Sequence, residues 1–273
     1  LDMAEAGPVK SLFDEFRFEQ VFHLAAQAGV RYSQVNPQAY TASNIEGFLN
    51  LVESCCRLGV GHLIYASSSS VYGAHTSQPN RETSCTDRPV SLYAMTKKAN
   101  ELMAHTYSWT HGLPCTGLRL FTVYGPWGRP DMALYQFANA ILEDRPLTLH
   151  NQGFMQRDFT FVDDVVEAMV RLLPRPPIRQ PDLAPVRLLN VGNQQPVELR
   201  YFLHCIEECL GKKAIVQLGP ANAFEVVSTC ADVSDLEQAI GFRPNTPIAQ
   251  GVRRAIEWYL SYRGTNTPPT LRV

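Results

Sequence analysis

Four apolar runs along the chain have the pattern of buried strands. They are rich in β-branched and aromatic residues, they end in small or turn residues, and they cover residues 21–26, 62–73, 116–125 and 187–192. Helical periodicity separates the first three runs, in residues 39–59 and 91–112, and these patterns end at Gly59 and Gly112, as helices commonly do. Because strand and helix alternate, we predict an α/β fold with a doubly wound, Rossmann-type parallel sheet.

The pattern changes after residue 125, where loops and two short helical patterns replace the alternation. Residues 173–186 are rich in proline and predict a surface loop or linker, and from about residue 193 there is little strand signal. We therefore predict a smaller, mostly helical cap over the carboxyl edge of the sheet, where open α/β sheets bind ligands. The predicted domains are a sheet domain in residues 1–125, with a return segment at about 159–192, and a substrate-binding cap in residues 126–158 and 193–273.

The composition indicates small-molecule chemistry. The chain has 273 residues, 45% of them hydrophobic and 18% charged, which is enough to bury a core. Its net charge of −2 gives no basic footprint for nucleic acid or an anionic membrane. The seven cysteines form neither a disulfide framework nor paired metal-binding motifs, so we expect a cytoplasmic protein without a metal. No run approaches the ~18 apolar residues of a membrane span.

Tyr93 and Lys97 stand four positions apart in the helical pattern of residues 91–112, so their side chains share one helix face. When it is the only signal, a Tyr–Lys pair at this spacing more often belongs to the solvent-exposed face of a helix than to a catalytic site. A free tyrosine titrates near ~10 and is a poor base at neutral pH, whereas a cation one turn away lowers its pKa toward the range that acid–base catalysis needs. The pair can therefore move a proton to or from a bound hydroxyl.

Four serines, at positions 67–70, follow the apolar part of a predicted strand. A serine run can simply form a polar turn. In an open α/β sheet, however, side chains at the carboxyl ends of strands lie at the ligand site, where one of these hydroxyls can join Tyr93 and Lys97. Such a trio suits oxidation of an alcohol to a ketone, in which a proton and a hydride both leave, and the hydride acceptor is normally a nicotinamide cofactor.

Five stretches together resemble a known family. They are similar, in order and spacing, to motifs of the extended short-chain dehydrogenase/reductase family of NAD-dependent epimerases and dehydratases, and most similar to its UDP-glucuronate 4-epimerase branch. The stretches are "HLAAQAG", "YASSSSVYG", "PVSLYAMTKKANELMAHTY", "TGLRLFTVYGPWGRPDMA" and "RDFTFVDDVVE". The resemblance implies that Tyr93 is the catalytic acid/base, that Lys97 tunes it while holding the nicotinamide ribose of NAD, and that Ser68 is the hydroxyl partner. Ser69 or Ser70 can supply that hydroxyl if the turn is shifted.

The resemblance also implies positions along the rest of the cofactor and the substrate. The residues that it places beside NAD are Asp2, Leu24, Ala25, Ala26, Gln27, Asn44 and Phe121, in addition to Tyr93 and Lys97. Those implied for the substrate are Thr122 near the sugar, Arg129 at a sugar carboxylate and Arg157 at the nucleotide diphosphate. Several of these residues also have an explanation that involves no ligand. Small apolar residues are common in any buried strand, Asn44 could be a surface residue of a helix, and Arg129 could be an exposed charge in a loop.

The match lacks its usual beginning. The family opens with a strand, a glycine-rich turn of the G-x-x-G-x-x-G type and a helix whose N-terminus cradles the cofactor pyrophosphate, and these 273 residues contain no such stretch. The chain resembles the family from its third strand onward and starts at Leu1. We therefore expect an N-terminally truncated Rossmann domain, with roughly sixty residues of the usual fold missing, and weak NAD binding by this chain.

The sequence thus predicts an NAD-dependent 4-epimerase of UDP-sugars, which interconverts UDP-glucuronate and UDP-galacturonate through a 4-keto intermediate and works as a homodimer. A neutral-sugar epimerase acting on UDP-glucose and UDP-galactose is one alternative. Related dehydratases and decarboxylases carry an acid where this chain has Ser69 and Ser70, so β-elimination would lack its proton shuttle. The alternative from another class is a truncated protein that binds a nucleotide-sugar without turnover.

Overall fold

The computed structural model describes residues 1–30, 32–74, 77–220 and 226–264. The chain divides into two compact units, which are treated one at a time below. Unit 1 comprises Leu1–Leu120, Met169–Asn190 and Ser234–Gly241. Unit 2 comprises Phe121–Ala168, Val191–Val233 and Phe242–Val273. The assignment of one unit to the cofactor and the other to the substrate remains a prediction.

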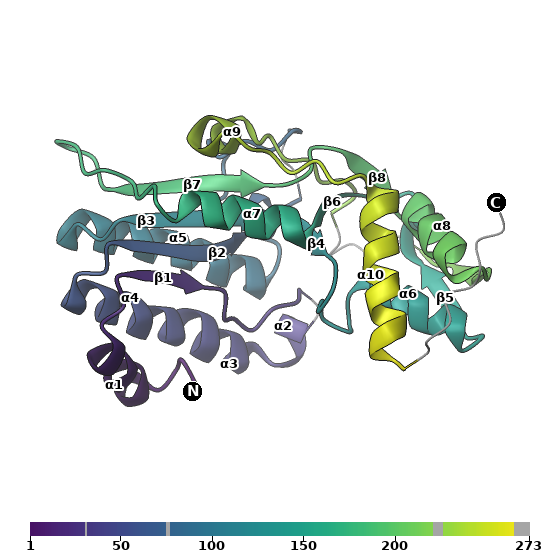
Figure 1. The fold of residues 1–273 in the computed structure, drawn as a ribbon, viewed down its shortest axis with the longest axis horizontal. Coiled ribbons are helices and arrows are strands. Elements are labelled where there is room, and N and C mark those ends of the chain that lie inside the picture. Colours follow the sequence, from purple (N-terminus) through teal and green to yellow (C-terminus); the bar gives the residue numbers. More distant parts are fainter. Residues whose placement is uncertain (31, 75–76, 221–225, 265–273) are drawn as a thin grey trace. The chain divides into compact units, whose positions relative to one another are not determined.

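Among the described residues, a four-stranded sheet forms the centre of unit 1 (Figure 1), in the order β1 (Gln20–His23), β2 (His62–Ser68), β3 (Cys115–Leu120) and β7 (Val186–Val191). β1, β2 and β3 are parallel, with Val21 opposite Leu63 and Tyr65 opposite Gly117. Six of the seven residues of β2 are buried, because helices cover both faces, and this explains the continuous apolar run in the sequence. The predicted α/β fold with a parallel sheet is confirmed.

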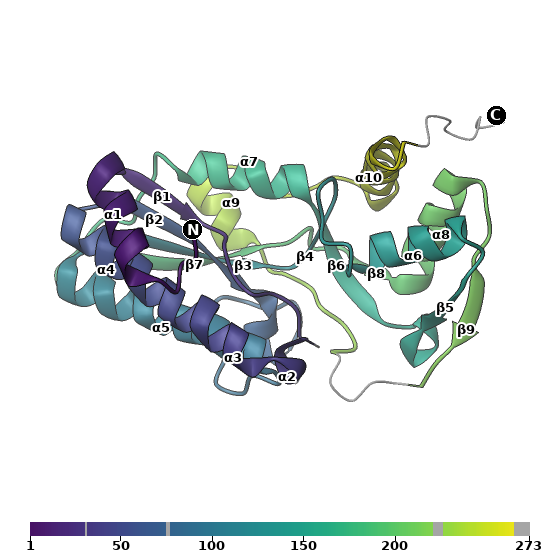
Figure 2. The ribbon, with the colours of Figure 1, turned by 90° about the horizontal axis from the view of Figure 1, so that it is seen from below.

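One face of this sheet carries helices from the first half of the chain (Figure 2), namely α1 (Ala6–Phe16), α2 (Tyr32–Val35), α3 (Pro37–Tyr40), α4 (Gly47–Leu58) and α5 (Leu92–His111). Over the other face lie α9 (Ser234–Ile240) and the C-terminal end of α7 (Val162–Leu172). A π-helical segment, Thr41–Glu46, joins α3 to α4. As predicted, α4 and α5 end at glycines with left-handed backbone, with φ of 67° at Gly59 and 73° at Gly112.

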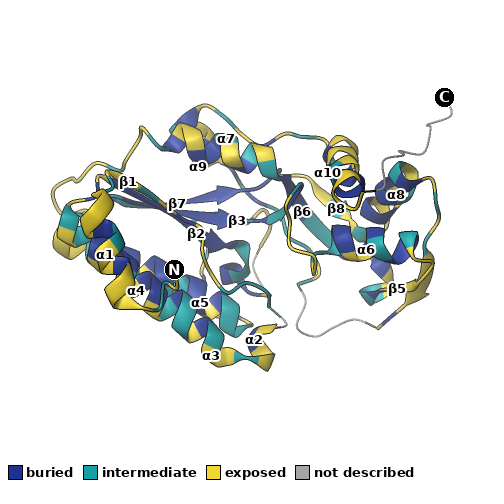
Figure 3. Cartoon of the chain, turned by 60° about the horizontal axis from the view of Figure 1, so that its bottom comes forward, coloured by how far each residue is buried: buried dark blue, intermediate teal, exposed yellow. Residues whose placement is uncertain are grey.

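An apolar core holds α1 and α4 on the sheet of unit 1. Val9 and Phe13 of α1 join a cluster with Phe48 and Val52 of α4 and Leu63 of β2, and each is at most 3% exposed. Burial of side chains of this size contributes about 1.5–3 kcal/mol each. Figure 3 shows that the buried residues lie on the helix faces turned toward the sheet. This core therefore holds a layer of helices on one face of the sheet. Helix α5 belongs to the same layer, since its Ala104 joins the cluster.

Short strands and helices build unit 2. β4 (Thr122–Tyr124) is parallel and β8 (Pro196–Glu198) antiparallel to β6 (Gln156–Phe161), while β5 (Pro146–Leu149) pairs in parallel with β9 (Ile215–Leu218). The helices of the unit include α6 (Ala133–Leu142), α8 (Leu199–Leu210) and α10 (Ile248–Tyr262). Phe159 of β6 and Phe202 of α8 stack with ring centroids 4.1 Å apart, and Tyr124 of β4 meets both rings edge-on. Aromatic packing thus joins sheet and helix in the core of this unit.

The prediction of a mostly helical cap with little strand missed β5, β6, β8 and β9. β8 has three residues, and all four residues of β9 are exposed, so neither shows a buried or alternating apolar pattern. The predicted strand 116–125 divides at Phe121 into β3 and β4. The predicted strand 62–73 ends at Ser68, and a 3₁₀ turn, Ser69–Tyr72, follows it.

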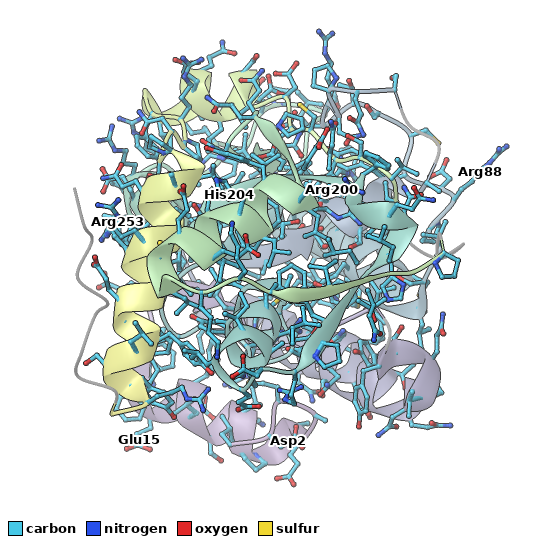
Figure 4. The ribbon with its side chains drawn as sticks, turned by 90° about the vertical axis from the view of Figure 1, so that its right-hand side faces the viewer. Asp2, Glu15, Arg88, Arg200, His204 and Arg253 are labelled. Carbon is cyan, nitrogen blue, oxygen red and sulfur yellow. The ribbon has the colours of Figure 1, made fainter. Side chains whose placement is uncertain are left out.

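Exposed charged and polar side chains lie on α8 and α10 of unit 2. Figure 4 shows Arg200 and His204 on α8 and Arg253 on α10, all of them exposed. Among the described residues, no helix combines the length and the apolar character needed to cross a membrane.

Gly251 of α10 provides a test of the packing in unit 2. A Cβ atom there would lie 2.0 Å from the hydroxyl oxygen and 2.8 Å from Cζ of Tyr124, whose ring is held in the aromatic core. We expect Gly251→Ala to lower the free energy of unfolding by about 1–3 kcal/mol through overpacking, as measured by urea denaturation. The matched control is Gly7→Ala in α1, where a Cβ meets nothing within 4 Å. It should be neutral or stabilising by up to about 1 kcal/mol, and equal effects of the two substitutions would contradict the packing described.

Candidate active site

Helix α5 presents Tyr93 and Lys97 in its first two turns. The side chain of Ser91 caps the helix, its Oγ accepting a hydrogen bond from the Ala94 amide at 3.1 Å. Lys97 lies on the buried face of α5 and is 3% exposed, whereas Tyr93 is half-buried. The predicted helix and the shared face of the pair are therefore present in the structure.

The ammonium group of Lys97 is bound to β2 near its carboxyl end. Its Nζ donates a hydrogen bond of 2.8 Å to the carbonyl oxygen of Ala66. Burial lowers the pKa of Lys97 from 10.5 to about 8, because the charged form loses its hydration. An ammonium group carries three N–H donors, and within the described part of the chain the Ala66 carbonyl accepts one of those of Lys97. A buried ammonium group with donors left over fits a ligand that brings hydroxyl oxygens, such as the ribose of a nicotinamide nucleotide.

Ser68 is the last residue of β2 and lies two residues beyond Ala66. It is 7% exposed, and its Oγ accepts a hydrogen bond from the Ser70 amide at 3.1 Å, which starts the 3₁₀ turn. The Ser68 and Ser70 hydroxyls are also 3.1 Å apart. Ser69 and Ser70 are half-buried on the same turn, so they stay alternatives for the catalytic hydroxyl.

Asn44, in the π-helical segment, links α5 to the chain that leaves β1. Its Oδ1 accepts from the Gln27 amide at 2.8 Å, and its Nδ2 donates to the Gln27 carbonyl at 2.9 Å and to Thr96 Oγ1 at 3.0 Å. The side chain is 2% exposed, and all of these partners belong to the protein. Asn44 therefore orders the neighbourhood of Tyr93 and Lys97, and π-helical turns are common at such sites.

The chain leaves β1 through an exposed segment beside α5. Leu24 is 54% exposed, and Ala25 and Ala26 are exposed with it, so an apolar strip lies open at this strand end. The hydroxyl of Tyr40 donates to the Gly29 carbonyl at 2.6 Å, and its ring meets that of Tyr93 edge-on at 6.2 Å. An open apolar strip at the end of β1 fits the flat, weakly polar face of a nicotinamide ring.

His23, the last residue of β1, is buried close to Lys97. Burial, together with the nearby charge of Lys97, lowers the pKa of His23 from 6.5 to about 4. The imidazole is 6% exposed and therefore neutral at physiological pH. His23 thus adds no second cation to the surroundings of Lys97.

Asp2 lies in unit 1 but is exposed (Figure 4), and its Oδ1 accepts from the Ala4 amide at 2.9 Å just before α1. The contact of Asp2 with adenine stays a prediction. The described residues contain no group of three or more His, Cys, Asp or Glu side chains that could hold a metal.

The remaining predicted residues belong to unit 2. Phe121 is 5% exposed, and its amide donates to the Val191 carbonyl at 3.0 Å. Thr122 begins β4, half-buried opposite Phe159. Arg129 is exposed and pairs with Asp131 of its own loop, with Nε and Oδ1 3.2 Å apart. Such an exposed pair contributes little, so the guanidinium can exchange Asp131 for another carboxylate.

Arg157 lies on β6 next to the buried Asp158. Its Nη1 donates to the Gln156 and Val227 carbonyls at 2.9 and 3.3 Å. The carboxylate of Asp158 accepts backbone amides from Asn193, Gln194 and Ala231 at 2.7–3.1 Å, yet burial still raises the pKa of Asp158. Asp158 therefore organises the loops around Arg157.

The sequence reasoning missed two charged residues that lie inside unit 1, Glu101 and Arg119. Arg119 Nε donates to Glu101 Oε1 at 2.8 Å, and the two side chains are 2–3% exposed. One signal was available: an arginine in the middle of the apolar run 116–125 has to find a buried partner.

A parallel α/β sheet with a Tyr–Lys pair at the start of one helix, and a serine at the end of the neighbouring strand, defines a protein of the short-chain dehydrogenase/reductase type. The sequence model of the NAD dependent epimerase/dehydratase family matches residues 1–186. The chain belongs to this family.

Individual relatives agree with that membership. Protein CapI of Staphylococcus aureus is 49% identical over 265 residues, which cover 93% of this chain and 79% of the relative. A probable UDP-glucuronate 4-epimerase of Rhizobium meliloti is 44% identical over 262 residues, covering 91% of this chain and 77% of the relative. The solved structure of MoeE5 in complex with UDP-glucuronic acid and NAD is 32% identical, with a TM-score of 0.83 over 93% of this chain and 82% of that one.

The buried charge of Lys97 predicts a pH dependence of stability. The folded pKa of about 8 lies below the unfolded 10.5, so between these values the unfolded chain binds more protons and the contribution of Lys97 to stability rises with pH. Lys97→Met removes the buried charge and should raise the free energy of unfolding at pH 7 by up to about 3 kcal/mol, offset in part by the lost hydrogen bond. This gain should shrink by about 2 kcal/mol at pH 10.

Urea unfolding at pH 7 and pH 10 measures both values. The matched control is Lys10→Met on the exposed surface of α1, whose effect should be the same at both pH values. A gain from Lys97→Met that does not change with pH would refute the buried ammonium.

Proposed function

We propose that the protein is an NAD-dependent 4-epimerase of UDP-sugars that interconverts UDP-glucuronate and UDP-galacturonate through a 4-keto sugar. The observation that carries the proposal is the Lys97–Ala66 hydrogen bond, which ties the helix of Tyr93 to the strand end of Ser68. The relative from Rhizobium meliloti, named a probable UDP-glucuronate 4-epimerase, and the MoeE5 complex with UDP-glucuronic acid and NAD support the substrate class.

The proposed cofactor contacts lie mainly in unit 1. Lys97 and Tyr93 bind the nicotinamide ribose, Leu24, Ala25, Ala26 and Gln27 line the cofactor, Asn44 orders this segment, and Asp2 meets the adenine. Phe121, at the start of unit 2, packs against the nicotinamide. When bound, NAD supplies the hydride acceptor for C4 of the sugar.

The proposed chemistry of the chain's own residues is proton transfer at O4 of the sugar. Tyr93 takes the proton as the alcohol becomes a ketone and returns it after the 4-keto sugar has turned over. The ammonium of Lys97, one helical turn away, favours the phenolate of Tyr93. The hydroxyl of Ser68 donates to O4 as charge develops there. Unit 1 thus serves as the cofactor domain and unit 2 as the substrate domain.

Tyr93→Phe tests the acid/base role of this residue. Turnover of UDP-glucuronate should fall at least about a hundredfold, because no other group takes the O4 proton, while NAD binding measured by calorimetry should change little. The control is Tyr262→Phe on the exposed end of α10. A Tyr93→Phe enzyme with more than a tenth of the unmutated rate would show that another group is the base.

The sugar preference depends in this proposal on Arg129. A hexuronic acid carries a carboxylate that neutral sugars lack, and a charge-assisted contact to it contributes ~1.5–3 kcal/mol, roughly tenfold to a hundredfold in discrimination. Arg129→Ala should therefore narrow the ratio of kcat/KM for UDP-glucuronate over UDP-glucose by that factor, mainly by weakening the acid sugar.

Arg145→Ala is the matched control, because Arg145 is also exposed in unit 2 and pairs with a carboxylate two positions away, Glu143, at 2.7 Å. It should leave the ratio unchanged. Equal kcat/KM values for the two sugars in the unmutated enzyme would favour the neutral-sugar epimerase instead.

We also propose that two copies of the chain associate through α4 and α5. Met95, Leu102 and Trp109 are 38–58% exposed and recur every seven residues along α5, which is the spacing of a helix–helix seam. Leu49 of the adjacent α4 adds a fourth exposed apolar side chain. A symmetric dimer buries this self-complementary face.

Leu102→Glu places a charge in that proposed seam and should convert the dimer to a monomer in light scattering at micromolar concentration. The control is Leu183→Glu, at a leucine of similar exposure (60%) in a loop of unit 1. A chain that is monomeric without substitution, or a Leu102→Glu variant that stays dimeric, would contradict the proposed interface.

We also propose a cytoplasmic location. The seven cysteines are free thiols, as is usual in a reducing compartment.

A further inference from the structure

We infer that Ser67 and Glu101, held by Arg119, are positioning residues that fix the catalytic turn of Ser68 against the helix of Tyr93 and Lys97. This inference rests on the proposed function for the roles of Ser68, Tyr93 and Lys97. None of the three positioning residues is among those predicted to touch cofactor or substrate.

Two contacts one helical turn apart join α5 to consecutive residues of β2. Lys97 Nζ donates to the Ala66 carbonyl at 2.8 Å, and Ser67 Oγ donates to Glu101 Oε1 at 2.6 Å. A single contact lets a helix pivot on a strand, whereas two contacts on successive strand residues fix both the rotation and the register. Ser68 follows directly, so its height relative to Tyr93 is set by this pair of contacts.

Arg119 of β3 fixes Glu101 from the other side. Its guanidinium is bidentate, with Nε to Oε1 at 2.8 Å and Nη2 to Oε2 at 2.9 Å. Its Nη1 donates to the Tyr72 hydroxyl at 3.1 Å and to the Glu82 carbonyl at 3.0 Å. The Cζ atom of Arg119 also lies over the ring of Tyr72, 4.9 Å from its centroid.

Ser67 lies two residues before the Ser69–Tyr72 turn and Tyr72 is its last residue, so the Glu101–Arg119 ion pair contacts the chain at both ends of the turn. The far end is secured again because the Tyr72 hydroxyl donates to Asn190 Oδ1 at 2.6 Å. The backbone N–H of Asn190 donates in turn to Glu82 Oε1 at 2.6 Å. The catalytic turn is thus tied to α5, β3 and the end of β7 through one connected set of hydrogen bonds.

Stability alone is a weak reason for this arrangement. A buried ion pair loses about as much by desolvation as it gains by attraction, and apolar residues of the same volume often do as well. What apolar residues do not provide is direction. Catalytic geometry is sensitive to displacements of about 1 Å, which can change rates roughly a hundredfold, so directional contacts beside Ser68 have a functional effect that packing does not replace.

Ser67→Ala tests the inference with little risk to the fold, because Glu101 keeps its bidentate partner. The kcat for UDP-glucuronate should fall about tenfold while KM stays within twofold, and Ser67→Thr, which restores the hydroxyl, should recover most of kcat. The matched control is Ser54→Ala, which removes a buried serine of α4 and its 2.8 Å bond to the Asn50 carbonyl. It should leave kcat and KM unchanged.

Hydrogen exchange of residues 66–72 provides a readout that needs no turnover. Exchange should quicken in Ser67→Ala and not in Ser54→Ala. Unchanged kcat in Ser67→Ala, or an equal fall in kcat in both variants, would overturn the inference. If the unmutated enzyme does not epimerise UDP-sugars, the proposed function fails, and the exchange comparison alone then decides whether Ser67 holds the turn.

Discussion

The ammonium group of Lys97 is bound by the carbonyl oxygen of Ala66, and the arrangement of unit 1 around the site follows from that contact. β1 ends opposite Tyr65, so Ala66 lies on β2 just beyond the β1–β2 pairing. A charge buried to 3% exposure requires an acceptor of this kind, since the unpaired charge would cost several kcal/mol. Because the acceptor belongs to the backbone, this contact limits how far α5 can slide along β2.

α5 is held on the sheet by directional contacts as well as by its apolar face. Thr96, Lys97 and Glu101 each contact a different part of unit 1, namely Asn44, Ala66 and Ser67. Apolar burial supplies much of the energy but is indifferent to small sliding motions. The polar contacts select one position of the helix, and with it one position of the Tyr93 side chain.

The sequence predicted the alternation of strand and helix, the glycine ends of α4 and α5, and the Tyr–Lys pair, because each depends on local spacing alone. It missed β8 and β9, which are short or fully exposed and so leave no periodic signal. A run of four serines could not indicate which hydroxyl caps the turn, since that depends on where β2 ends. Partners distant in the chain were equally hidden: Glu82 and Asn190 are 108 positions apart and yet bonded.

The hydrogen bonds of Asn44 determine which substitutions positions 27 and 44 can accept during evolution. Its amide bonds the backbone N–H and C=O of Gln27, groups that every residue but proline offers. Position 27 is therefore open to many side chains as far as this link is concerned, whereas position 44 needs a group that donates and accepts at once. Aspartate at position 44 would keep the shape and the bond from the Gln27 amide but would lose both donors, so a change that looks conservative there would weaken the link between α5 and the chain beyond β1.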